Sequence, residues 1–218
     1  MPQHLQKDLE RLKKMVLDIG TMVEESLSNA IIALNKRDKT LAESIIDGDS
    51  EIDQREVVIE QECLKILALH QPVAKDLRFV VAILKLNNDL ERVGDLAVNI
   101  AQRSTTLSSN APVPIPSDIK LMADKAIVMV KQSFDSLIDT DTHLAETVCA
   151  ADDEVDALQQ RLYSQLQAEI KKAPQNVEQY VQLLSVVRYL ERIADQATNI
   201  AEDVIYLVEG EVVRHRGN

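Results

Sequence analysis

The amino-acid sequence predicts an all-α protein that consists of two tandem three-helix bundles related by an internal repeat. Three observations lead to this prediction: a motif that occurs twice, a composition that suits long helices, and a proline-rich segment near the middle of the chain. Two repeats of about 100 residues also match a common domain size.

The repeated motif begins at Leu90 and returns 100 residues later at Leu190. The segments LERVGDLAVNIA (90–101) and LERIADQATNIA (190–201) are identical at eight of twelve positions. An internal copy of this kind is direct evidence of a repeat architecture. Apolar residues in both copies are spaced alternately by four and three positions. This spacing is typical of the helix face that packs against other helices.

The composition favours long helices with an aliphatic core. Hydrophobic residues make up 45% of the chain, but only 3% are aromatic and none is Trp. Five Gly and six Pro in 218 residues leave few breaks. Such a composition is typical of helical bundles.

The first half predicts three helices. A helical apolar period runs from residue 3 to 35, and Asp38 is then an expected N-cap for a helix that ends near Ala68. Pro72 breaks the pattern, because proline disfavours helix before it, and a third helix runs from 73 to about 104.

A linker and a second set of three helices follow. Three alternating prolines forbid helix within 107–116. Ser117 is the expected N-cap of a helix to about 138, and Asp141 precedes the next helix as Asp38 did, at an offset of 103. After Pro174 the last helix runs from 176 to 209, with Gly210 as its stop. The predicted division is a first repeat (1–106), a linker (107–116), a second repeat (117–210) and a C-terminal tail (211–218).

Pairs of acidic residues spaced by four recur at matching places in both halves. Two carboxylates at this spacing are neighbours on a helix and repel by a few tenths of a kcal/mol, so a repeated pair indicates a bound cation. Two such helices side by side would bring four carboxylates together in each half. The candidate metal ligands are Asp49, Asp53, Glu91 and Asp95 in the first half, and Asp152, Asp156, Glu191 and Asp195 in the second. Oxygen ligands suit hard ions; the candidates are iron, Mg, Mn, Ca and Zn, and the spacing does not choose between them.

Other interpretations of these acids stay open. The pairs could be solvated surface, with Arg92 and Arg192 neutralising their neighbours. They could also serve a metal-storing or metal-dependent hydrolytic enzyme. A di-iron enzyme would require Glu-x-x-His pairs, and the chain has none. It also has no Gly-rich phosphate loop and no nucleophile elbow.

The net charge of −12 argues against several kinds of partner. Nucleic acid and anionic lipid are held by clustered Lys and Arg, which this chain lacks. The negative charge also argues against direct phosphate binding unless a metal mediates it. The longest apolar run, 79–84, is too short to span a bilayer, and the first residues have no apolar signal core. Cys63 and Cys149 lack metal-type spacing and are expected in the core of a cytoplasmic protein.

Several linked motifs resemble one known family over nearly the whole chain. They are QPVAKDLR (71–78), DLERVGD (89–95) with NIA (99–101), LERIAD (190–195) with ATNIAE (197–202), and the ending YLVEG (206–210). These segments are similar to PhoU, a family of bacterial phosphate-transport accessory and regulatory proteins. The sequence departs from the family at Gln196, where many members carry His.

The resemblance implies a fold and a function. Similar proteins fold as two three-helix bundles, and their acidic motifs, which bind metal clusters in some members, fall on the eight residues named above. The family acts with the ATPase subunit of the phosphate ABC transporter and with the phosphate-sensing histidine kinase. It restrains phosphate uptake and silences the phosphate-starvation response. The resemblance therefore implies a non-enzymatic cytoplasmic adaptor, peripheral to the inner membrane through its partners, with a tendency to form homodimers.

Overall fold

The computed structural model describes residues 3–209, which form six long helices and no strand. The predicted all-α class is confirmed. The helices are α1 (Gln3–Lys36), α2 (Lys39–His70), α3 (Ala74–Ser108), α4 (Ser117–Asp139), α5 (Thr142–Lys172) and α6 (Val177–Glu209), with a short 3₁₀ turn η1 (Pro174–Asn176) before α6.

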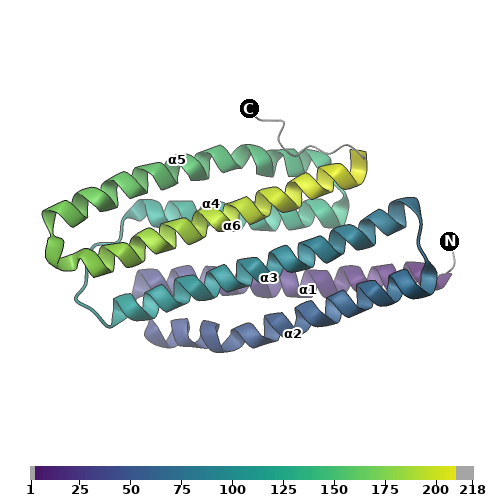
Figure 1. The fold of residues 1–218 in the computed structure, drawn as a ribbon, viewed down its shortest axis with the longest axis horizontal. Helices are drawn as coiled ribbons and strands as arrows, with labels where there is room; N and C mark the ends of the chain where they lie inside the picture. The colour runs from purple at the N-terminus through teal and green to yellow at the C-terminus, as the bar shows by residue number, and fades with distance from the viewer. Residues whose placement is uncertain (1–2, 210–218) are drawn as a thin grey trace.

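The helices are arranged as two adjacent three-helix bundles (Figure 1). The helices α1, α2 and α3 pack on one another, as do α4, α5 and α6. The bundles meet where α3 packs against α6 and α1 against α4, while α2 and α5 lie on opposite outer sides. One continuous apolar core runs through both bundles. In the described part of the chain, no helix is long and apolar enough to cross a membrane.

Two of the three predicted helix caps are confirmed. The Asp38 side chain accepts a hydrogen bond from the Leu41 N–H at 3.0 Å, and Asp141 accepts from the Leu144 N–H at 3.1 Å. The prediction of a Ser117 cap was wrong, because Pro116 occupies the cap position and makes no side-chain cap bond. The prolines hold the chain extended up to that residue, so Ser117 is already helical.

The helix α3 ends four residues later than predicted, at Ser108. Hydroxyl groups of its last turns donate to backbone carbonyls three or four residues earlier, for example Ser108 Oγ to the Ser104 oxygen at 2.8 Å and Thr105 Oγ1 to the Gln102 oxygen at 2.8 Å. The predicted linker therefore loses its first two residues to the helix. The Gly210 stop and the tail at 211–218 lie outside the described residues.

The connection between the bundles is tied to the end of α1. Arg37 has a positive φ of 54°, and its guanidinium donates to the Leu107 oxygen at 2.9 Å and to the Val113 oxygen at 2.7 Å. Val113 itself is buried. Arg37 therefore joins the end of α3 to the linker, through one carbonyl of each.

The interface between the bundles is closely packed at one glycine. A Cβ atom at Gly20 of α1 would lie 2.7 Å from the Phe134 ring of α4. Polar contacts join α3 to α6 beside the core, including an ion pair between Lys85 and Asp203 at 2.9 Å. The two repeats thus share an interior.

Candidate metal centre

The eight predicted acidic residues form two groups, one on each hairpin of long helices. The first cluster contains Asp49 and Asp53 of α2 with Glu91 and Asp95 of α3, and the second cluster contains Asp152 and Asp156 of α5 with Glu191 and Asp195 of α6. The core fixes their positions. Ile52 and Leu90 are buried, which places the next residue of each helix at the edge of the helix contact.

The side chains of the first cluster influence one another electrostatically. Burial raises the pKa of Asp49, and the charges of Asp53 and Asp95 raise it further. The pKa of Glu91 is raised by burial and then by Asp95 and Asp53, and that of Asp95 by burial and Asp53. The four carboxylates of the first cluster are therefore near enough for their charges to interact, and their role as metal ligands stays a prediction.

The second cluster shows the same pattern more strongly. Burial, followed by Asp156 and Asp195, raises the pKa of Asp152 to about 6. Burial also raises the pKa values of Glu191 and Asp195, with Asp156 adding to both shifts. Each cluster is consequently a place where negative charge is unfavourable without a compensating cation.

Exposure is the same at equivalent positions of the two clusters. Asp49, Asp152, Glu91 and Glu191 are partly buried. The second member of each pair is exposed, namely Asp53, Asp95, Asp156 and Asp195. Each cluster therefore opens to solvent on one side, where an ion can enter.

The arginines beside the clusters do not neutralise them through ion pairs. Within the described residues, no Lys or Arg forms an ion pair with any of the eight carboxylates. The Arg92 guanidinium lies 3.9 Å from Asp89 instead. Arg92 lowers the pKa of Glu91 and Arg192 that of Asp195, but burial and the neighbouring carboxylates outweigh them, so both pKa values remain raised.

The chemistry of the donor set fits hard cations, although the ligands are not closely converged. Both clusters offer carboxylate oxygens, the donors that Ca, Mg, Mn and ferric iron prefer. Among residues 3–209, no three Asp, Glu, His or Cys side chains are placed closely enough to hold one ion. Binding would therefore require rotation of the exposed members.

A fifth acid of the first cluster, Glu56, was missed by the sequence analysis. Its charge contributes to the raised pKa of Glu91, and its carboxylate accepts a hydrogen bond at 3.0 Å from Asn87, whose own side-chain oxygen is buried without a hydrogen-bond partner in the described chain. The signal was its position three residues after Asp53, on the same helix face. It escaped notice because the equivalent residue of the second repeat is Gln159, which hydrogen-bonds to Glu191.

Both cysteines lie at the core, as expected. Burial raises the pKa of the Cys63 thiol to about 12 and that of Cys149 to about 11. The thiols are free and stay protonated at neutral pH. Since the thiolate is the form that binds metal or attacks a substrate, neither cysteine is suited to these roles.

Known proteins share this architecture over most of their length. The family model of the PhoU domain matches the chain twice, at residues 16–104 and 119–204. The chain is 42% identical to the phosphate-specific transport system accessory protein PhoU homolog of Aquifex aeolicus over 210 residues, covering 96% of this chain and 95% of that protein. It is 32% identical to the phosphate-specific transport system accessory protein PhoU of Escherichia coli K12, covering 96% and 87%.

Solved structures agree with the sequence comparisons. The crystal structure of PhoU from Pseudomonas aeruginosa superposes with a TM-score of 0.91 at 34% identity, covering 94% of this chain and 99% of that one. The phosphate transport system regulatory protein PhoU from Streptococcus pneumoniae gives a TM-score of 0.89 at 30% identity, covering 96% and 99%. The duplicated match explains the internal repeat, and the chain belongs to the PhoU family.

Proposed function

We propose that this protein is a regulatory accessory protein of a phosphate-specific transport system and restrains uptake when phosphate is plentiful. The observation that carries the proposal is a match over almost the whole chain, in both repeats, to proteins named phosphate-specific transport system accessory protein PhoU. The names of these relatives describe accessory and regulatory roles and mention no reaction. Regulation by binding, without catalysis, is the corresponding role here.

The protein would act as an adaptor on the cytoplasmic side of the inner membrane. Its partners would be the ATPase subunit of the transporter and the phosphate-sensing histidine kinase. Exposed apolar side chains on the outer face of α2 support a protein partner, because Val57, Val58 and Leu64 are each about half exposed at 45%, 51% and 54%. The acidic chain would favour partner surfaces rich in Lys and Arg.

The two carboxylate clusters would bind metal ions that neutralise them and stiffen each hairpin. The Asp49–Asp53 and Glu91–Asp95 pairs would hold an ion between α2 and α3, with Glu56 as a further oxygen donor. The equivalent pairs would do so between α5 and α6. A bound cation supplies positive charge that offsets the mutual repulsion of the carboxylates. Its role in this proposal is structural.

The adaptor role can be tested by affinity purification from membrane extracts of the native host, grown with abundant or scarce phosphate. Recovery of the transporter ATPase or the sensor kinase, in amounts that change with phosphate supply, is the expected result. Recovery of neither protein under both conditions would contradict the adaptor role.

Metal binding can be tested by elemental analysis and calorimetry of the purified protein. Replacing the four acids of either cluster with Ala should remove the ions of that cluster alone, whereas Asp124→Ala should remove none, because Asp124 is an exposed acid paired with Lys120. Unchanged stoichiometry in the cluster variants would refute the assignment. Phosphate-ester hydrolysis or iron oxidation that disappears in the same variants would favour the enzymatic alternative.

A further inference from the structure

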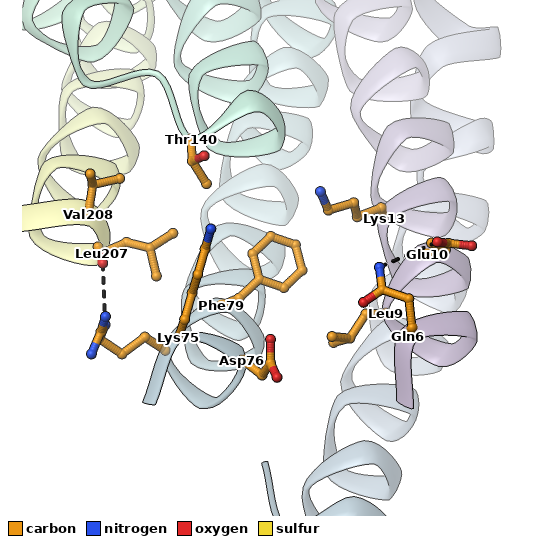
Figure 2. Close-up of a pocket in the computed structure, with 11 residues that line it drawn as sticks. Gln6, Leu9, Glu10, Lys13, Lys75, Asp76, Phe79, Thr140, Leu207 and Val208 are labelled. Atoms are coloured by element: carbon orange, nitrogen blue, oxygen red, sulfur yellow. Dashed lines mark hydrogen bonds between the residues drawn. The ribbon is translucent and has the colours of Figure 1, made fainter. Parts of the chain in front are cut away.

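A cavity of about 590 Å³ lies at the end of the molecule where α1 and α3 begin and α4 and α6 end (Figure 2). Both repeats line it. Lys13 of α1 and Lys75, Asp76 and Arg78 of α3 come from the first repeat, while Thr140, Leu207 and Val208 come from the second. In Figure 2 the Lys13 and Lys75 side chains extend from different helices toward the same space beneath Thr140.

The three cations of this cavity have no carboxylate partner. Within the described residues, neither Lys13, Lys75 nor Arg78 forms an ion pair, although acidic residues outnumber basic ones by 36 to 24 in the chain. No local spacing in the sequence indicates this group of cations, because two of them lie about 60 positions from the third. The fold brings them together.

Only some of the nitrogens of these three cations donate hydrogen bonds to carbonyls at helix ends. Lys13 donates to the Ile138 oxygen at 3.5 Å and Arg78 donates through Nε to the Leu207 oxygen at 3.3 Å, so both satisfy carbonyls near helix ends of the second repeat. The terminal nitrogens of Arg78 and the Lys75 ammonium make no hydrogen bond in the described part of the chain. These groups remain available to a ligand.

The second repeat supplies an internal comparison. At the offset of 100 that relates the two motifs, Lys75, Asp76 and Arg78 correspond to Gln175, Asn176 and Glu178. The same kind of hairpin therefore forms without these positive charges, and with a negative one in place of Arg78. The cations of the first repeat are not a requirement of the three-helix fold.

We infer that this cavity binds a phosphate-class oxyanion, either inorganic phosphate or the phosphate group of a small organic molecule. Lys75 and Arg78 would hold the anion through charge-assisted hydrogen bonds, with Lys13 opposite. The first turn of α3 adds free N–H groups, because its N-cap residue Val73 makes no side-chain cap bond. The inference is independent of the protein partners proposed above.

Asp76 gives the site a means of choosing between oxyanions. Its carboxylate lines the same cavity, as does that of Glu10. The charge of either carboxylate opposes a bound anion unless a hydrogen bond joins the two groups. Hydrogen phosphate has an O–H group that can donate a hydrogen bond to a carboxylate. Sulfate has no O–H group at neutral pH. The site should therefore prefer phosphate to sulfate.

The ligand would also connect the two repeats. Its cationic contacts belong to α1 and α3, and these same residues donate to carbonyls of α4 and α6. An anion bound by Arg78 and Lys13 would therefore hold both side chains in place beside the second repeat. Occupancy would stiffen this end of the molecule.

The test is titration of the purified full-length protein with inorganic phosphate, followed by calorimetry and ³¹P nuclear magnetic resonance. Saturable binding is expected, and Lys75→Gln should weaken it about tenfold, equal to about 1.4 kcal/mol. Lys75 is the preferred variant because it makes no hydrogen bond or ion pair in residues 3–209. Lys171→Gln, which alters a cation on α5 outside the cavity, should leave binding unchanged.

Competing anions separate the two ligand sources and test Asp76. A sugar phosphate that displaces inorganic phosphate at lower concentration would assign the site to an organic phosphate, and weaker displacement would assign it to the free ion. Sulfate should compete poorly in the wild type and well in Asp76→Asn. Absence of saturable phosphate binding, or binding that Lys75→Gln does not alter, would overturn the inference, and equal competition by sulfate in the wild type would overturn the role of Asp76.

Discussion

Gly20 faces the Phe134 ring across the contact between α1 and α4, with no room for a methyl group. Gly20→Ala should destabilise the protein, because the added Cβ forces the ring or the helices to move at a cost of about 1–3 kcal/mol. This cost exceeds the gain of about 1 kcal/mol that alanine brings to a helix interior. Urea unfolding measures the difference.

The matched control for this variant is Gly48→Ala in α2. Apart from the chain neighbours and the backbone of its own helix, no atom of the described residues lies within 4 Å of a Cβ at Gly48. Only the helix-propensity gain therefore applies, and the free energy of unfolding should rise by up to about 1 kcal/mol. Similar destabilisation by both variants would show that packing against Phe134 is not the cause.

The charge of Asp152 should reduce the stability of the metal-free protein at neutral pH. Its pKa is raised from 3.8 to about 6 in the folded state, so the folded protein binds the proton more tightly than the unfolded chain does. The stability contributed by this group is present below pH 4 and is lost as the pH rises to about 6. Asp152→Asn should therefore stabilise the protein by about 1 kcal/mol at pH 7, after allowance for solvent screening.

The measurement is chemical unfolding in the presence of a chelator at pH 4 and pH 7. The difference in unfolding free energy between Asp152→Asn and the wild type should be near zero at pH 4 and positive at pH 7. A difference that is the same at both pH values would mean that the carboxylate charge is not responsible.

Individual residues were predictable from the sequence where the repeat displayed them twice. The four acidic pairs stand out because each spacing recurs in the second half, and their role as metal ligands stays a prediction. Glu56 was not, because its counterpart is an amide. The contact of Gly20 with Phe134 joins distant segments, and no local spacing reveals it.

At the scale of elements, the interhelix linker depends on one side chain, Arg37. Its guanidinium holds two carbonyl groups, of Leu107 and Val113, at either side of the turn that leaves α3. Arg37→Met should destabilise the protein by about 1.5–3 kcal/mol, the usual contribution of hydrogen bonds from a charged donor. It should also release the linker.

Amide hydrogen exchange can localise this effect. In Arg37→Met, protection should fall from the end of α3 to Ile119 and stay unchanged in the middle of α5. Lys36→Met, at the adjacent position in the last turn of α1, should leave protection near the linker as it is in the wild type. Uniform loss of protection would indicate global destabilisation instead.

Helix starts were predicted better than helix ends. Asp38 and Asp141 act on N–H groups three residues ahead, so the necessary information lies in a few neighbouring positions. The end of α3 depends on a series of Ser and Thr hydroxyls that bond to carbonyls. Since the same residues also favour turns, sequence reasoning assigned them to the linker.

At the scale of the whole molecule, the two repeats should unfold together. They share one apolar core and bury the faces between α3 and α6 and between α1 and α4. The full chain should give one thermal transition, with equal calorimetric and van't Hoff enthalpies. A fragment of residues 1–108 should be much less stable, because it exposes apolar surface of α1 and α3. Two separate transitions, or a fragment as stable as the full chain, would contradict this.

The number of repeats could be read from the sequence, but the extent of their joint interior could not. The prediction of two halves rested on the repeat and on the three prolines of the linker. Contacts such as Lys85 with Asp203 depend on the antiparallel placement of α3 beside α6, which no spacing within either helix indicates.

The two hairpins differ in length in a way that suggests how the protein has changed since its duplication. Glu91 follows Asp53 by 38 positions, whereas Glu191 follows Asp156 by only 35. In an antiparallel hairpin, residues lost around the turn shorten both arms equally, here by about 2 Å each at a rise of 1.5 Å per residue. The carboxylates on the two arms therefore remain opposite one another. Insertions and deletions at these hairpin tips leave the helix contacts unchanged. The tips can therefore diverge between the two repeats while the carboxylates of each cluster stay opposite one another.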